Sequence, residues 1–142
     1  MDETILCLLA RGEASLVLKK GGVIVFSQFG RGIGPALTLF DEHPALLRGA
    51  EVYDTIVGKA AASLFLLGGA SFVWGGTMSR SAEALLTRYG VPCACQTLTD
   101  EIINRQGTGL CPFEQAVLPF HTPEACLPVI RATLRALKSS QK

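Results

Sequence analysis

The sequence predicts a three-layer α/β/α domain in which a mixed β-sheet lies between helices on both faces. Residues 15–27 form a predicted N-terminal β-hairpin, because two β-branched or aliphatic runs flank Gly21-Gly22 and glycines allow the backbone angles of a tight turn. Further along, predicted helices and strands alternate, which suits parallel pairing through crossover helices. Apolar residues make up 49% of the chain and the mean hydropathy is +0.36, as expected for a sheet covered on both faces.

Local signals place the elements along the chain. In order, we expect a helix over residues 2–11, the hairpin, helices over 36–47 and 52–67, a strand over 70–74, a helix over 79–89, a strand over 91–97, a short helix from Cys111 and a last helix from Thr122. The stretch 52–67 is apolar on nearly all sides, which predicts a central, buried helix. Ser79 is expected to cap its helix, and Pro128 to kink or delay the last one. No repeat or linker divides the chain, so residues 1–142 form one predicted domain.

The charge distribution argues against nucleic acid as a partner, and the length of the apolar runs argues against a membrane-spanning segment. The formal net charge is +1, and basic residues gather only in the C-terminal tail, at Arg131, Arg135, Lys138 and Lys142. That tail is more simply the polar face of a helix than a nucleic-acid footprint. The longest apolar run, 60–74, is interrupted by serines and glycines and is shorter than the roughly 20 residues of a membrane helix.

The N-terminal residues and the cysteine count predict the cellular compartment, and the apolar content predicts the oligomeric state. The N-terminus Met1-Asp2-Glu3 is acidic where a secretory signal would be basic. The five cysteines are an odd number without framework spacing, which fits free thiols in a reducing cytoplasm. The excess of apolar residues also predicts that hydrophobic surface is buried in a homo-oligomer.

The stretch from Asn104 to Glu114 carries the densest group of functional side chains. It combines an amide, a guanidinium, a hydroxyl, a thiol and a carboxylate in a predicted loop that leads into a helix. Loops of this composition usually serve binding or catalysis. Cys111 and Glu114 have the spacing of a capping box. Glu114 is expected to cap, while Cys111 is either a packed thiol or one activated at a helix N-terminus.

Asp54 and Lys59 form a second polar group within the apolar stretch. Five residues separate them, about 140° around a helix, so they are not a routine surface ion pair. One interpretation makes Asp54 a first-turn partner of the helix dipole and Lys59 a lysine that reaches the surface. The other places Lys59 under a pocket, where it acts as a base or binds an anion. A P-loop is excluded, because Ala60 follows Lys59 where Ser or Thr is required.

Three further groups allow a functional and a structural interpretation. Arg31 lies among the glycines of residues 30–34, which either form a tight turn or receive a phosphate or carboxylate before a helix. Cys93 and Cys95 imitate a metal motif, but no histidine or second cysteine pair has ligand spacing, so we expect packed thiols. His43 and His121 have no visible partner and are expected on the surface.

The order of elements, with a buried helix after the hairpin, resembles the cytidine-deaminase-like superfamily of α/β/α domains. The segments Gly30–Ile33, Asp54–Ala62 and Asn104–Glu114 resemble those of a small bacterial family of unknown function, counted as an outlier of that superfamily. Deaminases carry a His-x-Glu or Cys-x-Glu motif and a Pro-Cys-x-x-Cys motif. The corresponding places here read Asp54-Thr55-Ile56 and Thr77-Met78-Ser79-Arg80-Ser81. We therefore expect neither zinc nor deamination.

Together these observations predict a cytoplasmic, zinc-free, deaminase-like domain without a cofactor that binds a small anionic or nucleotide-like metabolite. The ligand-binding residues would be Arg31, Asp54, Lys59, Asn104, Arg105, Thr108 and Cys111. One alternative is a metal-free enzyme that uses Lys59, Cys111 or Asp54. The other is a structural or interaction module without a ligand.

Overall fold

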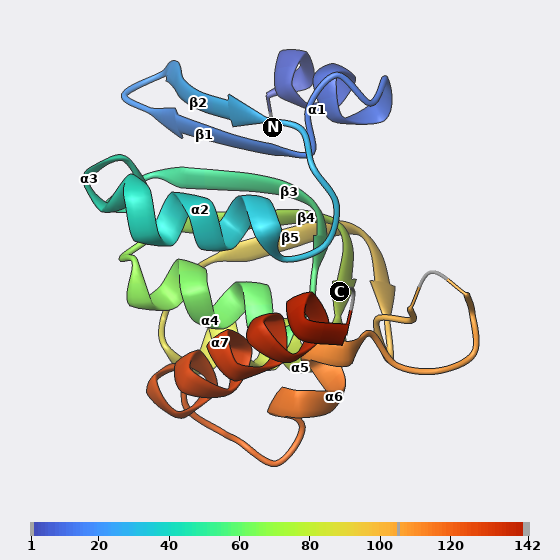
Figure 1. The fold of residues 1–142 in the computed structure, drawn as a ribbon. Coiled ribbons are helices and arrows are strands. Elements are labelled where there is room, and N and C mark those ends of the chain that lie inside the picture. Colours follow the sequence, from blue (N-terminus) through green and yellow to red (C-terminus); the bar gives the residue numbers. More distant parts are fainter. Residues whose placement is uncertain (1, 105, 141–142) are drawn as a thin grey trace.

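The computed structural model describes residues 2–104 and 106–140, and its centre is a five-stranded mixed sheet with helices on both faces (Figure 1). The strands lie in the order β2-β1-β3-β4-β5. Their bounds are β1 (Leu16–Lys20), β2 (Val23–Gln28), β3 (Glu51–Val57), β4 (Phe72–Ser79) and β5 (Cys93–Thr99). β1 is antiparallel to β2 and β3, whereas β3, β4 and β5 are mutually parallel. The predicted hairpin and parallel strands are both confirmed.

The hairpin turn follows from its two glycines. Gly21 and Gly22 have φ angles of 55° and 80°, a region that glycine enters without the steric cost of a side chain. The register of the hairpin shifts between Leu18 and Lys19. In the strand order, β2 lies at one edge of the sheet, and β1 lies between β2 and β3.

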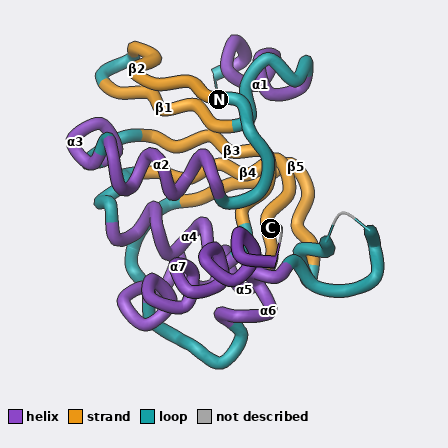
Figure 2. The backbone as a smooth tube through the Cα atoms, in the orientation of Figure 1, coloured by secondary structure: helices purple, strands orange, loops and turns teal. Residues whose placement is uncertain are grey.

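The helices are distributed unequally over the two faces, as the tube view also shows (Figure 2). Their bounds are α1 (Glu3–Ala10), α2 (Gly34–Glu42), α3 (Pro44–Leu47), α4 (Lys59–Leu67), α5 (Arg80–Arg88), α6 (Pro112–Val117) and α7 (Pro123–Ser140). Buried residues of α2 to α7 join one large core cluster on one face. On the other face α1 packs Ile5 and Leu9 against Val17, Tyr53 and Trp74. Among the described elements, α1 is the helix that packs on this second face.

The prediction of one helix over residues 52–67 is wrong. Residues 51–57 form β3, and the helix α4 begins only at Lys59, after Gly58 in an extended conformation with φ −97° and ψ −176°. β3 is a central strand, and a strand packed on both faces is apolar at consecutive positions, like a buried helix. The β-branched and aromatic residues Val52, Tyr53, Ile56 and Val57 are the local signal that favours the strand.

The other predicted elements differ mainly at their ends. The helix expected over 36–47 divides at His43, the residue before Pro44, where proline disfavours helical backbone. Ser79 caps α5 as predicted, since its Oγ accepts a hydrogen bond of 3.1 Å from the Ala82 amide. α7 begins at Pro123 and includes Pro128, so its start is not delayed.

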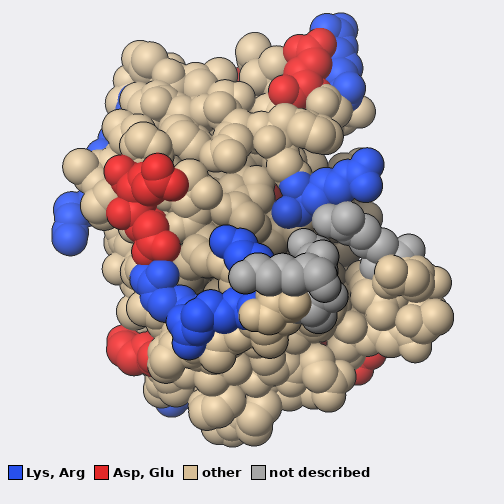
Figure 3. All heavy atoms as spheres, in the orientation of Figure 1, with Lys and Arg blue, Asp and Glu red and all other residues tan. Residues whose placement is uncertain are grey.

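The C-terminal basic residues belong to a helix, as expected. Arg131, Arg135 and Lys138 lie on α7, and Lys142 is outside the described residues. Figure 3 shows basic side chains gathered over α7, with acidic ones beside them. Arg131 donates two hydrogen bonds, of 2.9 and 2.8 Å, to the carboxylate of Asp41. Over the described ranges, no helix has both the length and the apolar character needed to cross a membrane.

Candidate functional site

The N-terminus of α4 is closed by a carboxylate from α6. Glu114 accepts hydrogen bonds of 2.7 Å from the Lys59 amide and 2.9 Å from the Ala60 amide. A Cβ at Gly58 would overlap the Glu114 carboxyl group, so glycine is needed for this approach. Burial raises the pKa of Glu114, while the two amides and the Lys59 charge oppose that rise. Glu114 does cap a helix as predicted, but the helix is α4 rather than its own.

The Lys59 ammonium group is committed to the backbone beyond α6. Its side chain is buried, and Nζ donates hydrogen bonds of 3.2 Å to the Leu118 carbonyl and 2.8 Å to the Phe120 carbonyl. The first turn of α4 is thereby joined to α6 through Glu114 and to the α6–α7 connection through Lys59. Lys59 is thus buried rather than reaching the surface, and two backbone carbonyl groups satisfy its ammonium donors.

Asp54 lies five residues earlier, in the middle of β3. Its neighbours in the sheet are Leu16 on β1 and Gly75 on β4. Burial raises the pKa of Asp54 to about 7 from the ordinary 3.8, although the amides of Ile56 and Thr55 act in the opposite direction. Within residues 2–104 and 106–140, no hydrogen bond or ion pair joins Asp54 to Lys59.

The polar loop before α6 is held by its own hydrogen bonds and projects beyond the end of the sheet (Figure 1). The Asn104 side chain donates to Thr108 Oγ1 and accepts from the Thr108 amide, both at 3.1 Å. Cys111 is half-buried at the N-cap position of α6, and its side chain forms no capping hydrogen bond. Arg105 lies outside the described residues. Asn104 and Thr108 are therefore brought together, and Cys111 is placed close to Glu114 in α6.

Arg31 is exposed in the turn before α2. Gly32 in this turn has a φ of 66°, and the Gly30 amide donates a hydrogen bond of 3.0 Å to Ser15 Oγ. The N-cap residue of α2 is Ile33, whose side chain forms no capping bond.

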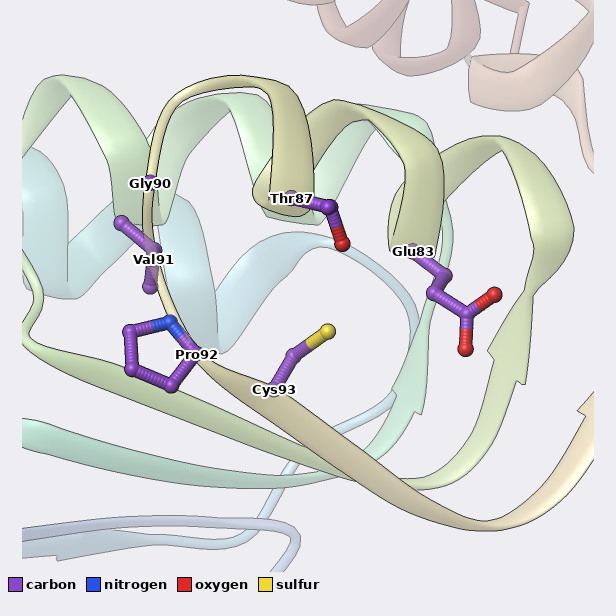
Figure 4. A pocket seen from close by; sticks show the side chains of 6 residues that line it. All are labelled: Glu83, Thr87, Gly90, Val91, Pro92 and Cys93. Atoms are coloured by element: carbon purple, nitrogen blue, oxygen red, sulfur yellow. The ribbon is translucent and has the colours of Figure 1, made fainter.

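Cys93 lines a small hollow between α5 and β5. This hollow has a volume of about 390 Å³, and Figure 4 shows the Cys93 sulfur and the Thr87 hydroxyl facing the same space, with Glu83 beside them. Burial, followed by the charge of Glu83, raises the pKa of the Cys93 thiol. Among the residues that the structure describes, no group of three or more His, Cys, Asp or Glu side chains is arranged to hold a metal ion.

A larger hollow lies between α1 and strands β3, β4 and β5. Its volume is about 880 Å³. Its lining consists of Glu3, Leu6, Cys7, Leu9 and Ala10 from α1 and Thr55, Trp74, Gly76, Thr77, Gln96 and Thr97 from the sheet. Apolar walls with a few hydroxyl, amide and carboxylate groups are typical of small-molecule sites.

Three threonine side chains give the larger hollow a polar floor. Thr77 on β4 is the register partner of Thr97 on β5, and Thr55 lies on the adjacent strand β3, where the next residue, Ile56, is the partner of Thr77. A Cβ at Gly76 would lie 2.7 Å from the Thr55 carbonyl oxygen, so the strands approach closely there. Adjacent strands are about 4.8 Å apart, so Thr77 and Thr97 lie side by side. Thr55, one residue before the partner of Thr77, adds a third hydroxyl group to the lining, and the three residues are called the threonine row.

This threonine row was not identified from the sequence. Thr55 lay in the stretch interpreted as a helix, and the strand expected over 70–74 ended before Thr77. The available signal was the position of each threonine near the carboxyl end of a parallel strand, where open α/β sheets commonly bind ligands.

Comparisons with known proteins assign the chain to a family. The profile described as "Domain of unknown function (DUF1893)" matches residues 4–134. The structure is similar to the crystal structure of the DUF1893 family protein TM1506 from Thermotoga maritima, with a TM-score of 0.80 and 28% sequence identity over 94% of this chain and 88% of that one. No curated protein matches the chain. The chain belongs to the DUF1893 family, a family of domains of unknown function.

Proposed function

We propose that this domain binds a small polar molecule in the hollow between α1 and strands β3 to β5. The observation that carries the proposal is the lining of the 880 Å³ hollow, in which Thr55, Thr77 and Thr97 face apolar residues of α1. The volume lies within the roughly 300–1,000 Å³ of ligand pockets. Hydroxyl groups both donate and accept hydrogen bonds, so the row suits an oriented polar ligand.

The N-terminal end of α4 is less suited to a ligand than the hollow beside α1 is. A helix N-terminus binds anions through free amides, but here Glu114 already accepts from the amides of Lys59 and Ala60. Lys59 must also give up two carbonyl partners before it can bind an anion. The anion site expected from the sequence, formed by Arg31, Asp54, Lys59, Asn104, Arg105, Thr108 and Cys111, stays a prediction.

Native mass spectrometry of freshly purified protein tests the proposed site. The wild-type chain should retain a small molecule that is released on denaturation. The double variant Thr77→Val, Thr97→Val keeps the side-chain shape and removes two hydroxyl groups, and it should lose that molecule. Thr4→Val changes an exposed threonine outside the hollow and serves as the matched control. Equal retention by both variants would contradict binding in the hollow.

The second candidate function is that of a metal-free enzyme. The raised pKa of Asp54 favours this candidate. A carboxyl group with a pKa of about 7 can both accept and donate a proton at neutral pH. Replacing Asp54 with Asn should abolish any turnover detected in a metabolite screen. It should leave ligand retention in the hollow intact, because Asp54 does not line the hollow. Turnover that survives this replacement would exclude Asp54 as the proton-transfer group.

The deaminase-like arrangement, the cytoplasmic location and self-association are also part of the proposal. The order β2-β1-β3-β4-β5, with α4 between β3 and β4, supports a deaminase-like arrangement without the zinc motifs. The cysteines are all free thiols, which supports a cytoplasmic location. Exposed Val23 and Ile24 on β2 support self-association through that edge.

A further inference from the structure

We infer that the ligand of the hollow between α1 and the sheet carries a positive charge, as an ammonium group does. This inference rests on the proposed binding function and concerns the chemical class of the ligand. Glu3 is the carboxylate among the lining residues, and none of the lining residues is Lys, Arg or His. A ligand seated there therefore meets one carboxylate and no compensating protein cation.

Glu3 is available for such a ligand. It is exposed in the first turn of α1. The neighbouring acid, Asp2, is already engaged, because its Oδ2 lies 3.0 Å from Lys19 Nζ. In the described part of the chain no ion pair involves Glu3. The nearest acidic neighbour along the chain is thus paired with Lys19, while no ion pair of the described residues engages the Glu3 carboxylate beside the hollow.

The surroundings strengthen attraction to a cation and repulsion of an anion. Leu6, Leu9 and Trp74 exclude part of the water from the hollow, and charges interact more strongly where water is displaced. Thr77 and Gln96 offer oxygen acceptors that an ammonium group can also use. An anion would lose water and meet Glu3, with no charged donor in return.

The charge preference can be measured with three probes that share a hydroxyphenylethyl group. Tyramine is a cation, tyrosol is neutral, and 3-(4-hydroxyphenyl)propionate is an anion at neutral pH. Trp74 is the only tryptophan of the chain and lines the hollow, so its fluorescence, excited at 295 nm, reports occupancy. Tyramine should bind about fivefold more tightly than tyrosol, the upper range for a partly exposed ion pair. The anion should bind most weakly.

Two variants assign the preference to one carboxylate. Glu3→Gln should make the dissociation constants of tyramine and tyrosol equal while the melting temperature changes little. Glu13→Gln, an exposed carboxylate that does not line the hollow, should keep the preference. Equal affinity for all three probes in the wild-type protein, or tightest binding of the anion, would overturn the charge inference and leave the binding function standing. No fluorescence response to any probe would overturn both.

Discussion

The Glu114 carboxylate caps the helix that begins at Lys59, 55 residues earlier in the chain, by accepting its amide hydrogen at 2.7 Å. The same lysine reaches past α6 to the carbonyls of Leu118 and Phe120. The two residues therefore join α4, α6 and the α6–α7 connection through both backbone and side-chain groups. Glu114 thus occupies the N-terminal end of α4, which would otherwise attract an anion. The stability of the fold should therefore depend on Glu114 and on its close approach to α4.

Replacing Glu114 with Ala should destabilise the fold. The amides of Lys59 and Ala60 would be left buried without an acceptor, and the loss of such partners costs about 1–3 kcal/mol per group. We expect the free energy of unfolding to fall by about 3 kcal/mol, an estimate that also includes the lost cap. Urea denaturation measures the change, with the exposed Glu124→Gln as control. A loss equal to that of the control would refute the capping role.

Gly58→Ala should be destabilising for a reason that depends on Glu114. The added Cβ overlaps the Glu114 carboxyl group, whereas a Cβ at Gly109 would meet open space. Overpacking of this kind costs about 1–3 kcal/mol. In the Glu114→Ala background the overlap disappears, so most of the cost of Gly58→Ala should disappear as well.

A double-mutant cycle in urea measures this coupling between positions 58 and 114. Gly109→Ala provides the control and should be additive with Glu114→Ala. Additivity of Gly58→Ala with Glu114→Ala would show that the two residues do not meet in solution.

Asp54 should make the protein less stable as the pH rises from about 4 to about 7. Its pKa is about 7 in the folded state and 3.8 ordinarily, so over this range the folded protein binds a proton that the unfolded chain has lost. The sign of the linkage makes stability fall with pH, by at most about 4 kcal/mol and by less where water reaches the carboxylate. Burial shifts the pKa of Glu114 in the same direction and adds to the trend.

Asp54→Asn should remove the share of this trend that Asp54 causes and should stabilise the protein at pH 8. Thermal unfolding at pH 4.5 and pH 8 checks both statements. If the variant and the wild-type protein show the same dependence on pH, the buried carboxyl group is not the cause.

Self-association is expected through the β2 edge. Val23 and Ile24 are 62% and 39% exposed on a strand without charged residues, and such an edge invites pairing with another strand. A two-fold copy of β2 would continue the sheet. Val23→Lys with Ile24→Lys should therefore shift the mass measured by light scattering to that of a monomer. Leu118→Lys, at an exposed apolar residue elsewhere, should not, and a monomeric wild-type protein would refute this expectation.

Local sequence patterns predicted the parts of the structure that depend on residues close together in the chain. The glycines of the β1–β2 turn and the Ser79 cap of α5 were both identified from local patterns. β3 was mistaken for a helix because Val52 and Tyr53 pack into cores on opposite faces of the sheet, which removes the alternation that marks a strand. The contact of Glu114 with α4 spans 55 residues, and the local capping-box pattern pointed to the wrong helix. The threonine row depends on register between strands, which no local pattern specifies.

Site-resolved alkylation of the cysteines tests the central claim, which is ligand binding in the hollow beside α1. Cys7 is exposed and lines the hollow, whereas Cys111 adjoins the polar loop that the sequence favoured. A small-molecule extract of the source cells is added, and alkylation of each cysteine is followed by peptide mass spectrometry. Extract sufficient to occupy about two thirds of the protein should slow alkylation of Cys7 about threefold, since only the free fraction reacts. The rate at Cys111 should not change. An unchanged rate at Cys7, or protection of Cys111 instead, would contradict the account.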